Sequence, residues 1–189
     1  MLGPRNNIAG LALLADALTS LEIDPIPAGR GSHMTYPGDF DCNFRQALST
    51  DRDQLHRLIE RCWLEVYSPH LPRASIERFL ADDPIGTHLD VFLPFSEVAV
   101  VGDEVVGVVA VADGGVFSLF VAERFRGNRI GSCLLHNAMI AGGRWLEVPV
   151  FNVRAMAFYE ASGWTRAGES FEDVGGVRVA TVLMQVGVF

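Results

Sequence analysis

Three arginines and two glycines lie together where a predicted helix begins. Directly after an apolar, strand-like run, the sequence places Arg124, Arg126, Gly127, Arg129 and Gly131. The first N–H groups of a helix have no partner within the helix and carry a partial positive charge. Glycines let an anion approach these groups closely, and guanidinium groups suit phosphate oxygens. The stretch 121–135 is therefore a candidate phosphate-binding loop, and the alternative is a surface turn with solvated arginines.

Composition limits the partners of this chain. Its 189 residues are enough for one domain with a sizeable core, and 49% of them are hydrophobic. The formal net charge of -8 disfavours nucleic acid or an anionic membrane as the main partner and weakly favours a cationic substrate. No apolar run is long enough to cross a bilayer, so we expect no membrane partner.

The cysteines indicate neither a metal site nor a disulfide framework. Cys42, Cys62 and Cys133 are three in number and share no metal-ligand spacing. Unpaired, reduced thiols are typical of cytoplasmic proteins. We therefore expect no metal and a cytoplasmic location.

Residues 1–34 differ in composition from the rest of the chain. Leucines at helical spacing predict a helix at 7–22, and a linker rich in Pro and Gly follows at 24–31. The segment Gly31-Ser32-His33-Met34 resembles the short peptide that a cloning linker leaves at the start of a protein. We therefore interpret 1–34 as an attached extension, with a native extension as the alternative, and 35–189 as the functional domain. The extension's helix could dock on the domain or on a second copy, so a homodimer is possible.

Hydrophobic periodicity and turn residues predict, in order, a strand, two helices, a three-strand meander, a helix, a strand, a helix and a hairpin. Thr50 and Asp53 resemble a capping box at the start of the first helix. Asn152 is placed as the N-cap of the last one. The predicted strands are 44–48, 97–101, 105–112, 116–121, 145–150, 164–173 and 177–186, and the predicted helices are 51–66, 74–82, 130–141 and 152–163.

This element order and two motifs resemble the GNAT superfamily of acetyl-CoA-dependent N-acetyltransferases. The segment 126–131, Arg-Gly-Asn-Arg-Ile-Gly, is similar to the family's Gln/Arg-x-x-Gly-x-Gly/Ala loop, with Arg129 in place of the middle glycine. The segment 146–164 matches the second family signature at Asn152, Ala155, Phe158, Tyr159, Gly163 and Trp164. The resemblance implies an α+β fold with a mixed, mostly antiparallel sheet of about seven strands and helices on both faces. The sheet is expected to be splayed between the strands at 116–121 and 145–150.

The resemblance also implies roles for individual residues. The backbone of Leu119, Phe120 and Val121 would pair with the pantetheine arm of acetyl-CoA, and a backbone N–H of this strand would stabilise the oxyanion. Asn152 would hydrogen-bond the cosubstrate, and Tyr159 would protonate the leaving thiolate. The pyrophosphate would be held by Arg126, Gly127, Asn128, Arg129, Ile130, Gly131 and Ser132.

The acceptor and the general base stay open at this stage. A primary amine, either a small molecule or a protein amine, would attack the thioester directly, and it must be neutral to do so. Many relatives carry a Glu on the strand before the loop, but 116–121 contains no acid. Candidates on the substrate side are Asp113, Glu97 and His88, and a water chain or an amine of low pKa would also serve. The missing acid supports one alternative, a non-catalytic acyl-CoA-binding module.

Overall fold

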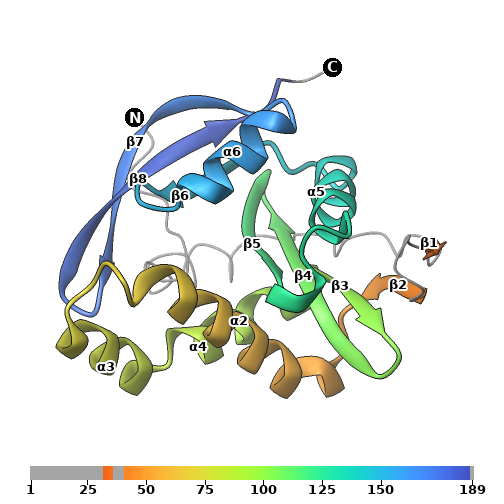
Figure 1. Cartoon of the computed structure of the whole chain (residues 1–189), viewed down its shortest axis with the longest axis horizontal. Helices are drawn as coiled ribbons and strands as arrows, with labels where there is room; N and C mark the ends of the chain where they lie inside the picture. The colour runs from red at the N-terminus through yellow and green to blue at the C-terminus, as the bar shows by residue number, and fades with distance from the viewer. Residues whose placement is uncertain (1–31, 36–40, 188–189) are drawn as a thin grey trace.

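A single mixed sheet organises the described part of the chain, which in this computed structural model is residues 32–35 and 41–187. Within these residues the sheet has eight strands in the order β1-β2-β3-β4-β5-β6-β8-β7 (Figure 1). The strands are β1 (Ser32–Thr35), β2 (Asp41–Gln46), β3 (Ser96–Val101), β4 (Glu104–Ala112), β5 (Gly115–Val121), β6 (Trp145–Pro149), β7 (Thr165–Val174) and β8 (Val177–Gln185). All neighbours are antiparallel except β5 and β6. The predicted fold class is confirmed, with β1 as an additional edge strand.

The edge strand β1 bears on the predicted domain boundary. It pairs with β2 through the register Ser32↔Phe44 to Thr35↔Asp41 and therefore runs across residue 34. The helix predicted at 7–22 and the linker at 24–31 lie outside the described residues. The interpretation of the N-terminal segment as an attached extension stays a prediction.

Helices cover both faces of the sheet (Figure 1). One core cluster joins α2 (Arg52–Tyr67), α3 (Arg73–Asp82) and α4 (Pro84–Phe92) to the sheet through buried side chains that include Leu55, Phe79 and Leu89. A second cluster joins α5 (Ile130–Ile140) and α6 (Val153–Ala161) to the opposite face. The helical stripes of apolar residues are buried as their spacing predicts.

Two helix starts differ from the sequence-based predictions. The predicted capping box at Thr50 and Asp53 is wrong: the Asp51 carboxylate accepts the Leu48 N–H at 2.8 Å and is also bound by Arg45. The helix α4 was not predicted. Asp83 caps it by accepting the Gly86 N–H at 3.0 Å, and Pro84 occupies its first turn, where a missing N–H costs nothing.

The sheet opens between β5 and β6. These two parallel strands share only the pair Gly115↔Trp145, and beyond it they have no common register in the described chain. On its other edge β5 has a register shift against β4 close to Ser118. Bulges of this kind bend a strand and are common beside active sites. The predicted splay is therefore present, and it leaves the 118–121 backbone facing a gap.

No helix within the described ranges is long and apolar enough to cross a membrane.

Candidate active site

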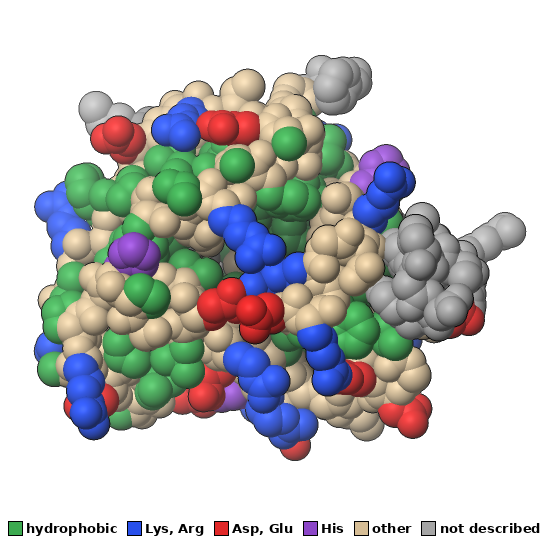
Figure 2. Space-filling view, in the orientation of Figure 1, with side chains coloured by type: hydrophobic (Ala, Val, Ile, Leu, Met, Phe, Trp, Pro, Cys, Tyr) green, Lys and Arg blue, Asp and Glu red, His purple; other side chains and the backbone are tan. Residues whose placement is uncertain are grey.

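A cavity of about 440 Å³ occupies the gap between β5 and β6. Figure 2 shows the face hollowed between α6 and α2, with apolar atoms inside and charged side chains meeting at its mouth. The walls come from α2, β5, the following loop, the start of α5, β6 and α6. Predicted site residues that line it are Leu119, Phe120, Val121, Arg126, Gly127, Arg129, Ile130, Gly131, Ser132, Asn152 and Tyr159.

One predicted loop residue does not line the cavity. Asn128 donates its side-chain amide to the Phe125 carbonyl at 3.3 Å, so it braces the turn. The backbone around it reverses direction at Gly127, with φ 82°, and again at Arg129, with φ 61°. Directly after them, the first residues of α5 line the cavity. The local geometry is that of an anion-binding helix start.

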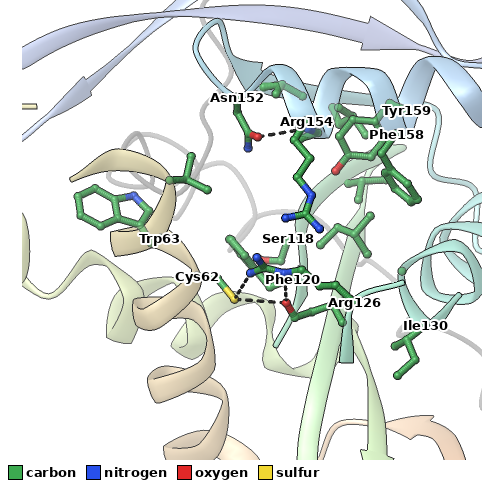
Figure 3. A pocket seen from close by; sticks show the side chains of 18 of the residues that line it. Cys62, Trp63, Ser118, Phe120, Arg126, Ile130, Asn152, Arg154, Phe158 and Tyr159 are labelled. Atoms are coloured by element: carbon green, nitrogen blue, oxygen red, sulfur yellow. Dashed lines mark hydrogen bonds between the residues drawn. The ribbon is translucent and has the colours of Figure 1, made fainter. Parts of the chain in front are cut away.

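The Arg126 side chain crosses the mouth of the cavity to α2. Its guanidinium forms a two-point ion pair with Glu65, with Nη2–Oε2 at 2.7 Å, and its Nε donates to the Val121 carbonyl at 2.9 Å. Its Nη2 also lies 3.6 Å from the Cys62 sulfur (Figure 3). The hydrogen bond from Arg126 lowers the pKa of Glu65. A phosphate contact by this side chain would require it to leave Glu65, so an anion at this loop would meet the backbone N–H groups first.

Arg129 is the N-cap of α5 in the left-handed region, where the family loop usually has glycine. An L-residue with a Cβ is less stable there by about 1 kcal/mol. Arg129→Gly should therefore leave the free energy of unfolding unchanged or raise it by up to about 1 kcal/mol, because glycine's greater unfolded entropy offsets part of the gain. Thermal unfolding checks this, with a rise in Tm of up to about 3 °C.

Arg124→Gly is the matched control for that prediction. Arg124 lies in the short 3-10 turn Glu123–Phe125 and has no positive φ. Glycine there should lower Tm, since it relieves no strain and loosens the turn. An equal loss of stability in both variants would show that the Arg129 backbone carries no strain.

The helix α6 supplies Asn152 and Tyr159. The Asn152 Oδ1 accepts the Ala155 N–H at 3.2 Å, which confirms the predicted N-cap. Tyr159 is 8% exposed and packs beside Phe158 and Trp164, and its hydroxyl oxygen points into the cavity (Figure 3). Burial raises the pKa of the Tyr159 hydroxyl above its usual range. At neutral pH this group therefore keeps its proton and can donate it.

The three base candidates from the sequence take different positions. Asp113 lies in the exposed turn after β4, and Glu97 accepts a hydrogen bond from Asn137 of α5 at 2.7 Å, so neither lines the cavity. His88 of α4 is fully buried, and its Nε2 lies 2.5 Å from the hydroxyl of Ser118, which does line the cavity. Burial lowers the pKa of His88 to about 3, so its imidazole stays neutral.

A group of acids on the α2 side of the splay was missed by the sequence reasoning. Glu147 of β6 is the one carboxylate among the described residues that line the cavity. Its Oε2 accepts the Thr181 hydroxyl at 3.1 Å. Glu172 of β7 is 3% exposed and accepts the Tyr67 hydroxyl at 2.6 Å. The alternation of β6, with Leu146 and Val148 in the opposite core, is the signal that could have identified Glu147.

Glu172 should make stability depend on pH. Burial, with the nearby Glu147 charge, raises its pKa to about 7, while the Tyr67 hydrogen bond opposes the rise. The folded state then binds more protons than the unfolded state between about pH 4.5 and pH 7, so stability falls as pH rises through this window. Between these limits the free energy of unfolding of the parent should fall by on the order of 3 kcal/mol, and Glu172→Gln should abolish this fall.

Urea unfolding at about pH 5 and about pH 8 measures this loss. Glu169→Gln, at an exposed position of the same strand, is the control and should keep the parent's pH dependence. If both variants follow the parent, Glu172 does not titrate in the predicted window.

Within the described ranges, no group of three or more His, Cys, Asp or Glu side chains is placed to hold a metal ion.

A known family model matches the part of the chain that surrounds the cavity. Residues 91–166, which include β5, the loop, α5, β6 and α6, match the family model described as acetyltransferase (GNAT) domain. A comparison with curated protein sequences found no match.

Solved structures share the fold over most of this chain. YjaB from Escherichia coli is 23% identical, with a TM-score of 0.62 over 78% of this chain and 99% of that one. A GCN5-related N-acetyltransferase from Rhodopseudomonas palustris is 16% identical, with a TM-score of 0.63 over 85% and 100%. PaiA N-acetyltransferase from Thermoplasma acidophilum, solved in complex with coenzyme A, is 16% identical, with a TM-score of 0.56 over 78% and 99%. Residues 91–166 thus match a GNAT acetyltransferase domain, and the solved structures have the fold of most of this chain.

Proposed function

We propose that this protein transfers an acetyl group from acetyl-CoA to a primary amine by direct attack in a ternary complex. The observation that carries the proposal is the cavity in the β5–β6 splay, which joins a helix start suited to phosphate with a buried, protonated tyrosine. The coenzyme A complex of the PaiA relative supports the choice of cosubstrate.

The residues of the cavity fit this cosubstrate. The N–H groups of Gly131 and Ser132 at the start of α5 would hold the pyrophosphate, with the Arg129 charge beside them. The Leu119–Val121 backbone faces the gap without a strand partner there and would pair with the amides of the pantetheine arm. Asn152 lines the same gap from α6.

Acetyl-CoA supplies an activated acetyl thioester. A C–N bond forms at the thioester carbonyl carbon and the C–S bond breaks. A backbone N–H of β5 stabilises the charge that develops on the carbonyl oxygen. Tyr159 donates its proton to the leaving sulfur, and the surplus proton of the new amide nitrogen restores the tyrosine.

Two measurements test this function together. Calorimetric titration with acetyl-CoA reports binding, and thiol release across a panel of primary amines reports transfer. Saturable binding with amine-dependent thiol release supports the proposal. Binding without release for any amine would identify a non-catalytic acyl-CoA-binding module instead, and absent binding would reject both.

A further inference from the structure

We propose that the Ser118 hydroxyl donates a hydrogen bond to the thioester carbonyl oxygen of acetyl-CoA, and that the buried His88 holds it in the donating orientation. The inference rests on the proposed acetyl transfer and adds a side-chain donor to the backbone N–H of β5. Ser118 is then a catalytic residue, and His88 is a positioning residue that acts through it.

Ser118 lies toward the closed end of the splay. It lines the cavity directly before the Leu119–Val121 backbone, which would pair with the pantetheine arm, and Figure 3 shows its side chain in the gap between α2 and α6. The two strands meet again at the pair Gly115↔Trp145. An arm that starts at α5 and runs back along β5 therefore brings its thioester end toward Ser118.

A bulge in β5 sets the direction of this side chain. The register against β4 shifts here: Ser118 and Val116 oppose neighbouring residues of β4, and Phe117 between them is extra. Such bulges re-aim side chains and occur often beside active sites. The result is a hydroxyl that borders the cavity on one side and contacts His88 of α4 on the other.

The contact between Ser118 and His88 determines which of the two groups donates. The Ser118 Oγ and the His88 Nε2 are 2.5 Å apart, and both residues are buried. The other ring nitrogen, Nδ1, is buried without a hydrogen-bond partner within the described residues. Burial lowers the pKa of His88 to about 3, so the ring is neutral and carries one N–H. Buried N–H groups without a partner are rarer than buried acceptors without one, so we assign the hydrogen to Nε2.

This tautomer leaves the hydroxyl hydrogen of Ser118 available to a ligand. The His88 Nε2–H donates to Oγ, and a serine hydroxyl still has one hydrogen of its own to donate. A fixed donor aimed at the charge that develops on a thioester oxygen lowers the barrier, most of all where water is excluded. Ser118 keeps its proton throughout, so no bond of its side chain is made or broken.

Stability alone does not account for this polar pair. The neighbouring core cluster is apolar and includes Phe92, Ala110 and Phe117, and the His88 ring lies 4.7 Å from the ring of Phe92. A partly satisfied polar pair in such a core is less favourable than apolar side chains of the same shape. A role of the hydroxyl in the cavity explains why the pair is present although one ring nitrogen lacks a partner.

The test compares Ser118→Ala with the parent by thiol release and by calorimetric titration. Loss of one donor to the oxyanion should lower kcat by about 10²–10³-fold. The affinity for acetyl-CoA should change by less than about threefold, because the donor acts mainly in the transition state. Ser75→Ala is the matched control, since Ser75 is also buried but donates to the Val174 carbonyl outside the cavity, and it should keep the parent's kcat.

Further variants separate catalysis from folding. Ser118→Ala alone leaves the His88 N–H unpaired, whereas Ser118→Ala combined with His88→Leu removes both polar groups. The double variant should therefore have a Tm at least as high as that of Ser118→Ala, while its kcat stays as low. His88→Gln carries an amide nitrogen that can still donate to Ser118, so it should keep a higher kcat than His88→Leu at equal affinity for acetyl-CoA.

Three results would overturn the assignment. The first is a parent-like kcat in a folded Ser118→Ala protein. The second is a raised KM for the amine at unchanged kcat, which would place Ser118 against the acceptor. The third is an equal kcat in His88→Gln and His88→Leu, which would remove His88 from the positioning role. Thiol release by the parent is measured first: its absence would reject the proposed function, whereas an active parent without a Ser118 effect would reject this inference alone.

Discussion

Tyr159→Phe should lower kcat by about 10²–10³-fold while the affinity for acetyl-CoA stays nearly unchanged. The substitution keeps the ring, which packs against Phe158 and Trp164, and removes only the hydroxyl. That hydroxyl points into the cavity, and its raised pKa keeps it protonated at neutral pH (Figure 3). A proton donated to the leaving sulfur acts only in the transition state, so its loss appears in kcat.

Thiol-release kinetics and calorimetric titration of the same preparation measure the two effects separately. Thermal unfolding is the control for packing, and Tm should change little because the ring remains. A kcat within about threefold of the parent corresponds to less than 1 kcal/mol in the transition state. In that case Tyr159 would be a packing residue, and the proton donor would have to be another group.

Much of the fold followed from local signals in the sequence. The glycine at 163, the Asn152 cap and the Gly175-Gly176 turn mark boundaries through backbone conformation, which is a property of single residues. The strands and helices predicted from periodicity are therefore present in the structure. The helix α4 was missed because Asp83-Pro84 also has the composition of a loop.

The site was less predictable, because its key contacts join residues that are far apart in the chain. Arg126 was expected to face a phosphate, yet it pairs with Glu65 of α2, 61 residues away. Glu147 lies between the apolar residues Leu146 and Val148, which belong to the core. The environment of the Glu147 carboxylate is set by Thr181 and Glu172, which the strand order β6-β8-β7 brings near it. Periodicity alone gives the face of a strand and leaves its neighbours undetermined.

Gly131→Val should weaken acetyl-CoA binding by about 100-fold or more, a loss of about 2.7 kcal/mol, while the protein stays folded. Gly131 is the second residue of α5 and has no positive φ, so its backbone accepts a side chain. A Cβ there would lie 3.6 Å from Val121 and 3.8 Å from Phe158, which is ordinary van der Waals contact. The two methyl groups beyond it would occupy the space between β5 and α6 in front of the first N–H groups of α5. In the proposed complex the pyrophosphate reaches those N–H groups, so the obstruction should act on binding and leave the core intact.

Calorimetric titration measures the loss, and two variants define its cause. Gly131→Ala adds the tolerated Cβ without the branches and should bind acetyl-CoA within about tenfold of the parent. Gly168→Val places the same side chain on β7, where a Cβ meets only Leu183 at 4.0 Å, and should bind normally. A graded loss from Ala to Val at position 131, with normal binding at 168, is the signature of a ligand that approaches the start of α5. Unchanged affinity in a folded Gly131→Val protein would place the pyrophosphate elsewhere, because no anion could reach the helix start past two added methyl groups.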